Sequence, residues 1–130
     1  MLNTSATSEF SGIAEVGAPS LVPDQPIDRT HLFKMTLGDH SLEGEVLRLF
    51  ERQTEMLLAR MTATEPARLK ALAHTLNGSA RGIGAWRVAC TAQAVEKAAS
   101  DSVSIEPALH ALRAAAEEAL AAIAELLRIH

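Results

Sequence analysis

An apolar stripe within residues 69–83 predicts a helix and divides it into a buried and an exposed face. The apolar residues recur there at helical spacing: Leu69, Leu72, Ala73, Leu76, Ala80 and Ile83. At about 100° per residue, His74 points roughly 140° away from the centre of that stripe. The same outward face carries Lys70, Asn77, Gly78 and Arg81. His74 is therefore expected on the surface of the protein and not in its core.

Glycines near this histidine predict that something large approaches it. Gly78 lies one turn after His74, and Gly82 follows one turn later. A glycine inside a helix costs about 1 kcal/mol relative to alanine, so bare backbone at these positions calls for a reason. We expect a partner to dock on this face, over Ala71, Thr75, Gly78 and Gly82.

The composition favours helices packed on helices. The 130 residues are 48% apolar but only 3% aromatic, with no tyrosine. A β-sandwich would need more aromatic and β-branched residues, whereas alanine and leucine suit helices. This length fits one domain with a core of its own.

The order of signals along the chain predicts an all-α domain. Residues 1–26, rich in Ser, Thr, Ala, Gly and Pro, are predicted to be a flexible leader, and residues 27–130 the domain. Helices are expected at 28–37 (capped by Asp28), 41–63 (capped by Asp39 or Ser41), 65–83 and 85–100, with a long last helix capped by Ser104. Leu42, Val46, Leu49, Phe50, Gln53, Leu57 and Met61 form a heptad-like stripe on the second of these. The predicted fold is an antiparallel up-down four-helix bundle with an additional short N-terminal helix.

Charge and cysteine content exclude some classes of function. The net charge of −4 argues against a nucleic-acid binder, but residues 65–100 have a local balance of +3. A basic region on an acidic protein suits a phosphoryl group or an acidic surface, although ordinary solvated helix charge gives the same pattern. No apolar run is long enough for a membrane span. A single cysteine, Cys90, fits a reducing cytoplasm, and a small packing role is expected for it.

The motif around His74 resembles that of a known signalling family. It reads His74-x-Leu76-x-Gly78-Ser79-Ala80-x-x-Ile83-Gly84-Ala85, followed by Val95-Glu96. This is similar to the histidine-containing phosphotransfer (HPt) domains of bacterial phosphorelays, whose pattern is His-x-Leu-Lys-Gly-Ser-Ala, then Gly-Ala and a Leu-Glu pair. The chain departs from the pattern at Asn77, where the family usually has lysine.

The resemblance implies a function in two-component signalling. Nε2 of His74 would accept a phosphoryl group from a receiver-domain aspartate or a hybrid histidine kinase and pass it to a response regulator. Such a protein is a phosphotransfer intermediate without a kinase domain. The receiver would supply Mg²⁺, so no metal or other cofactor is expected in this chain. Receiver domains are the expected partners, and a complete four-helix core predicts a monomer.

Further residues near His74 are candidates for supporting it. Nδ1 needs a partner that fixes the tautomer, and Glu96 is the candidate, with Gln93 one turn earlier as the alternative. Glu96 could instead be a surface residue paired with Lys97 or Arg87. Asn77 keeps a hydrogen-bond donor but loses the family's charge, which Arg81 and Lys70 could restore. The hypothesis is that phosphotransfer survives with weaker stabilisation of the phosphate, and Asn77→Lys should then lengthen the phosphohistidine lifetime or speed transfer.

Other interpretations stay open at this point. An HPt-like scaffold could bind a regulator without phosphotransfer, and the missing lysine favours it. The dimerisation helices of a histidine kinase would need a His-Glu-x-x-Thr/Asn-Pro pattern, which is absent, and a metal or haem bundle would need inward ligands. Trp86 is expected in the core or at its rim. Structural or solvent roles are expected for His31, His40, His110 and His130.

Overall fold

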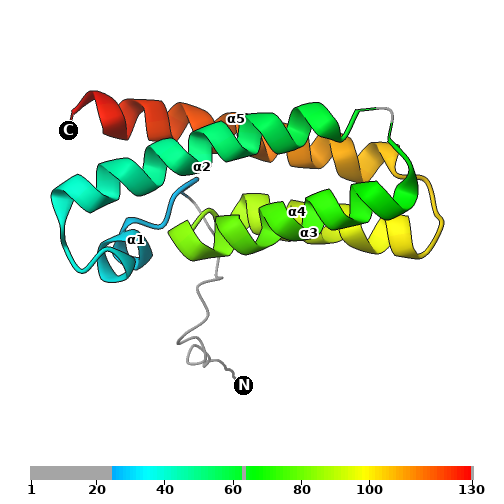
Figure 1. Ribbon diagram of the computed structural model, residues 1–130, viewed down its shortest axis with the longest axis horizontal. Helices are drawn as coiled ribbons and strands as arrows, with labels where there is room; N and C mark the ends of the chain where they lie inside the picture. Colours follow the sequence, from blue (N-terminus) through cyan, green and yellow to red (C-terminus); the bar gives the residue numbers. More distant parts are fainter. Residues whose placement is uncertain (1–24, 63, 130) are drawn as a thin grey trace, which may run out of the picture.

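The computed structural model describes residues 25–62 and 64–129, which form five helices and no strand. In chain order they are α1 (Arg29–Met35), α2 (His40–Arg60), α3 (Pro66–Ile83), α4 (Trp86–Ser100) and α5 (Glu106–Arg128). The four long helices run alternately in opposite directions, and α1 lies beside the C-terminal end of α3 (Figure 1). The predicted fold class is confirmed. The predicted leader lies outside the described residues, except for its last two positions.

Two of the three predicted helix caps are confirmed, at the starts of α1 and α2. The side chains of Asp28 and Asp39 accept hydrogen bonds from the backbone of His31 and Leu42, as N-caps do. The prediction that Ser104 caps the last helix is wrong. Ile105 is the N-cap there and gives no side-chain cap. Proline in the first turn, with its fixed φ, provides the start signal instead.

The core lies between the four long helices and is rich in alanine. α3 and α4 share the most extensive contact, followed by α4 and α5. Small side chains along this contact let the two helix backbones approach closely, which fixes α4 beside the histidine face of α3. The residues of α3 and α4 that are at most 1% exposed are Ala73, Leu76, Ala80, Val88, Ala89, Ala92 and Val95.

Two sequence expectations about packing are wrong. Leu42 and Leu49 of the predicted α2 stripe are exposed, because the buried face of α2 is centred about 60° from the centre of that stripe. It shares Phe50 and Leu57 with the stripe and adds Leu47 and Thr54. Cys90, expected to pack inside, is exposed. It falls between the buried positions of α4 and outside their stripe.

A small network attaches α1 to the turn between α3 and α4. The backbone N–H of Asp28 donates to the Gly84 carbonyl over 2.9 Å, and Trp86 Nε1 donates to Asp28 Oδ2 over 2.9 Å. The Trp86 hydrogen bond is the main cause that holds the pKa of Asp28 below its ordinary value of 3.8. His31 Nε2 donates to the Gly82 carbonyl over 3.2 Å, and its ring meets the Trp86 ring edge-on. This network fixes α1 beside the end of the histidine helix. Trp86, half-buried, lies at the rim of the core, as expected.

Candidate functional site

His74 projects from the middle of α3 into solvent. The helix buries Ala73 and Leu76 on its opposite face, and the imidazole side chain keeps 74% of its surface exposed. The predicted surface position of His74 therefore follows from the apolar stripe that faces the core. An exposed neutral imidazole is a nucleophile at neutral pH that can also act as a leaving group.

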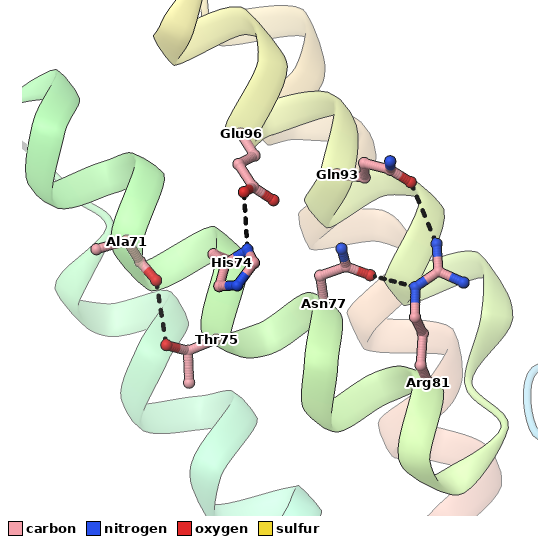
Figure 2. A network of polar contacts seen from close by, with 7 residues as sticks. All are labelled: Ala71, His74, Thr75, Asn77, Arg81, Gln93 and Glu96. Carbon is pink, nitrogen blue, oxygen red and sulfur yellow. Dashed lines mark hydrogen bonds and ion pairs between the residues drawn. The ribbon is translucent and has the colours of Figure 1, made fainter.

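Glu96 of α4 holds the imidazole by one nitrogen. His74 Nδ1 and Glu96 Oε2 lie 2.8 Å apart, and the carboxylate side chain is only 21% exposed (Figure 2). A carboxylate can only accept, so the proton of a neutral ring belongs on Nδ1 and the lone pair on Nε2. The alternative partners of Glu96 are engaged elsewhere: Lys97 pairs with Asp101 and Arg87 pairs with Glu118.

Asn77, Arg81 and Gln93 form a second hydrogen-bonded group beside the histidine. Arg81 Nε donates to Asn77 Oδ1 over 2.9 Å, and Arg81 Nη2 donates to Gln93 Oε1 over 3.2 Å (Figure 2). Gln93 therefore binds Arg81 and not His74, for which it was the alternative acceptor. Sequence analysis placed these three residues near the site but missed the bonds between them. The four-residue spacing of Asn77 and Arg81 was a usable signal.

Lys70 and Thr75 flank the histidine on different sides. Lys70 lines a shallow depression together with Glu96 and Gln93. The Thr75 hydroxyl donates to the carbonyl of Ala71 over 3.1 Å, so it turns back onto its own helix (Figure 2). Ala71 and Thr75 are both exposed.

Comparison with known protein families agrees with this geometry. The sequence model of the Hpt domain matches residues 45–127, which is more than half of the chain. The chain belongs to the Hpt domain family. Membership implies a role in histidine phosphotransfer within a phosphorelay, with phosphorelay proteins as partners. Neither the search of curated proteins nor that of solved structures finds a match.

Gly78 and Gly82, the two glycines predicted to give a partner access, have different surroundings. Gly78 is exposed, and a Cβ added to it would meet nothing within 4 Å. Packing within the domain therefore gives no reason for a glycine here. Gly82, predicted as a second access point, lies against α1: its carbonyl accepts from His31, and an added Cβ would lie 3.6 Å from Met35 Cε. Gly78 is the one with open space above it.

The described part of this Hpt domain shows no cluster of metal ligands and no helix suited to a membrane. The described residues contain no group of three or more histidine, cysteine or acidic side chains that could hold a metal ion. Among the described helices, none combines the length and the apolarity that a membrane crossing requires. Of the remaining histidines, His31 packs at the α1 network, whereas His130 lies outside the described residues.

Proposed function

We propose that His74 is the phosphoacceptor of a phosphorelay intermediate. It takes a phosphoryl group from the aspartate of a receiver domain, alone or within a hybrid histidine kinase, and passes it to a response regulator. The single observation that supports this best is the asymmetric environment of the ring. Nδ1 is held by Glu96 at 2.8 Å, while Nε2 makes no hydrogen bond to any described residue.

The transfer step follows from that arrangement. The Nε2 lone pair attacks phosphorus, an N–P bond forms, and the P–O bond to the aspartate breaks with its electron pair leaving on the carboxylate. The ring keeps its Nδ1 proton and becomes a cation, which the Glu96 carboxylate stabilises. The transition state is loose, so positioning and charge stabilisation account for most of the catalysis. The reverse reaction donates the group to a second aspartate.

The partner receiver would provide the chemistry that this chain lacks. Mg²⁺ and the acidic residues that bind it belong to the receiver, so none of the residues here is assigned to a metal. Access for the receiver is supported by the open surface over Gly78 and by the small side chain of Ala71. The local positive charge of residues 65–100 suits an acidic partner surface. A monomer in the cytoplasm is part of the proposal.

A non-catalytic scaffold is the second candidate. The observation that favours it is Asn77, which brings no charge to the position where the Hpt pattern has lysine. Such a scaffold would bind a receiver through the same face and form no phosphohistidine. The bond between Glu96 and Nδ1 argues for phosphotransfer, because binding alone does not require a fixed tautomer.

Phosphoryl transfer from a panel of phosphorylated receiver domains tests the proposal. Wild type should gain a label that is labile in acid and stable in base, and His74→Gln should gain none. His110→Gln is the matched control, because His110 is an exposed histidine on α5 and should leave labelling unchanged. Receivers that bind without labelling the wild type would favour the scaffold. Label on the His74→Gln variant would place the acceptor elsewhere.

A further inference from the structure

We infer that Arg81 is a positioning residue for phosphoryl transfer, because it fixes the orientation of the Asn77 carboxamide; this inference rests on the proposed function. Arg81 Nε donates to Asn77 Oδ1 over 2.9 Å. A guanidinium has only donors, so the oxygen of the carboxamide must face it. The chemistry of the partner thus decides which way the amide of Asn77 points.

Gln93 holds Arg81 from the neighbouring helix. Arg81 Nη2 donates to Gln93 Oε1 over 3.2 Å, and Gln93 belongs to α4 whereas Arg81 belongs to α3. An exposed arginine side chain would otherwise populate many rotamers. Its two hydrogen bonds, one to a residue of α3 and one to a residue of α4, hold the Arg81 side chain in the conformation that contacts Asn77. Gln93 therefore contributes to the orientation of Asn77 through Arg81.

The orientation leaves the amide nitrogen of Asn77 available for a ligand at His74. Asn77 follows His74 by three residues and precedes Arg81 by four, and Figure 2 shows the two on opposite sides of it. Residues at such spacings are neighbours on a helix surface. Asn77 Nδ2 donates to none of the described residues, and it lies on the side of the amide away from the guanidinium. Its two N–H groups can donate to the oxygens of a phosphoryl group on Nε2.

This arrangement gives asparagine a function at the position where the family pattern has lysine. A neutral amide lacks the charge of an ammonium group, but hydrogen bonding to a cation polarises the amide and strengthens its N–H donors. Compared with the family pattern, the positive charge lies one turn further along α3, on Arg81, and it acts on the phosphoryl group through Asn77. If Arg81 acted directly on the phosphoryl oxygens, its effect would not depend on Asn77.

A double-mutant cycle with a small phosphodonor distinguishes these two cases. Phosphorylation of His74 by phosphoramidate is followed by ³¹P NMR for wild type, Arg81→Ala, Asn77→Ala and the double variant. We expect each single variant to react about threefold more slowly than wild type, from the loss or disorder of one solvent-exposed hydrogen bond. The double variant should be no slower than Asn77→Ala alone. Multiplying effects would overturn the inference.

A spectroscopic signature separates positioning from a general loss of structure. The side-chain ¹⁵NH₂ signal of Asn77 should shift when His74 is phosphorylated in wild type and stay unshifted in Arg81→Ala. Arg87→Ala is the control, because Arg87 is on α4 and pairs with Glu118, and it should keep both the wild-type rate and the shift. A shift of the same size in Arg81→Ala would contradict the inference.

The phosphoramidate reaction also separates this inference from the proposed function. It needs no receiver, so coupling between Arg81 and Asn77 can be found even if no receiver transfers to His74. Conversely, transfer from a receiver with no coupling in the cycle would overturn only the role of Arg81. A wild-type chain that phosphoramidate does not label would remove the chemistry that Arg81 is proposed to serve, and the inference with it.

Discussion

Two histidines in this Hpt domain lie on neighbouring helices and use opposite ring nitrogens. His31 of α1 donates from Nε2, the far nitrogen, to the Gly82 carbonyl, and its ring meets Trp86 with a centroid separation of 4.9 Å. His74 of α3 is held through Nδ1, the near nitrogen, by Glu96. Nε2 is the outermost ring atom, and it is hydrogen-bonded in His31 but faces solvent in His74.

The difference teaches which feature of a histidine predicts reactivity. Both rings have a hydrogen-bond partner, so the number of partners does not separate them. The two rings differ in which nitrogen makes the hydrogen bond. A ring held at Nδ1 presents the lone pair of Nε2, its outermost atom, to solvent, whereas a ring held at Nε2 has that outermost atom occupied by a contact within the protein. His74 therefore suits group transfer, and His31 suits attachment of α1.

Replacing each histidine by glutamine gives the largest expected contrast. His74→Gln should abolish phosphorylation by receivers while changing the free energy of unfolding by less than about 0.5 kcal/mol, since the side chain is on the surface. His31→Gln should keep phosphorylation and lower the free energy of unfolding by about 1.5 kcal/mol, from one hydrogen bond and one aromatic contact. Urea unfolding and receiver labelling measure both. A large loss of stability in His74→Gln would contradict the comparison.

The attachment of α1 depends on Asp28, which serves as cap and acceptor at once. Asp28→Ala removes the α1 cap and leaves Trp86 Nε1 without its acceptor, so we expect a loss of about 2 kcal/mol in the free energy of unfolding. Asp39→Ala is the matched control, because Asp39 caps α2 without a tryptophan partner, and it should cost about 1 kcal/mol. Equal costs in urea unfolding would mean that the Trp86 bond adds nothing.

The pH dependence of stability follows from the same carboxylate. The pKa of Asp28 is lowered in the folded protein, chiefly by the Trp86 hydrogen bond. Its contribution to stability is therefore complete above its ordinary value of 3.8 and is lost as the pH falls through the lower folded pKa. The stability difference between wild type and Asp28→Ala should shrink as the pH falls below 3.8. A difference that stays constant down to pH values well below that would contradict this assignment.

Periodicity was sufficient to predict the helices and the surface position of His74. The stripe of α3 leaves only one face for position 74, and every residue of that stripe except the half-buried Leu72 is buried. Periodicity failed for Leu42 and Leu49, because α2 carries more apolar residues than its neighbours cover. Spacing alone does not say which of two adjacent apolar stripes is buried.

The contacts of the site were only partly predictable. The partnership of Glu96 with His74 was expected from the family motif, and the structure brings the two within 2.8 Å. The bond of Arg81 to Gln93 depends on the register between α3 and α4, which periodicity within one helix does not contain. Similarly, the position of Gly82 against α1 depends on where a separate helix attaches.

Glu96→Gln tests whether the charge behind the reactive histidine matters. Glutamine can still accept from Nδ1, but a bond to an ionised acceptor is about twice as strong as a neutral one, and the ring cation formed on transfer loses its counterion. We expect the phosphoryl-transfer rate to fall about tenfold, as measured by single-turnover labelling from a receiver. Glu118→Gln, which removes the negative charge paired with Arg87, should keep the wild-type rate. Equal rates in both variants would show that Nδ1 needs no charged partner.

Gly78→Ala tests whether the open surface beside His74 serves a partner. Nothing in the domain meets the added methyl group, so the helix should gain up to about 1 kcal/mol in stability. A receiver that packs on bare backbone would meet that methyl group, and we expect its transfer to His74 to slow about fivefold. Phosphorylation by phosphoramidate, which needs no docking, should be unchanged. Equal slowing with both donors would point to a local change at His74 instead.

Asn77→Lys is expected to have the smallest effect, and it restores the family's lysine beside the reactive histidine. The sequence alone predicted a gain, but in wild type the new ammonium group would replace the acceptor of Arg81 and lie next to its guanidinium, so we now expect little gain in rate. In the Arg81→Ala background that conflict is absent, and Asn77→Lys should recover the roughly threefold loss in the phosphoramidate reaction. An equal gain in both backgrounds would mean that positions 77 and 81 act independently. If Asn77→Lys raises the rate only in the Arg81→Ala background, a positive charge at either position 77 or position 81 supports the reaction, and a second one adds nothing.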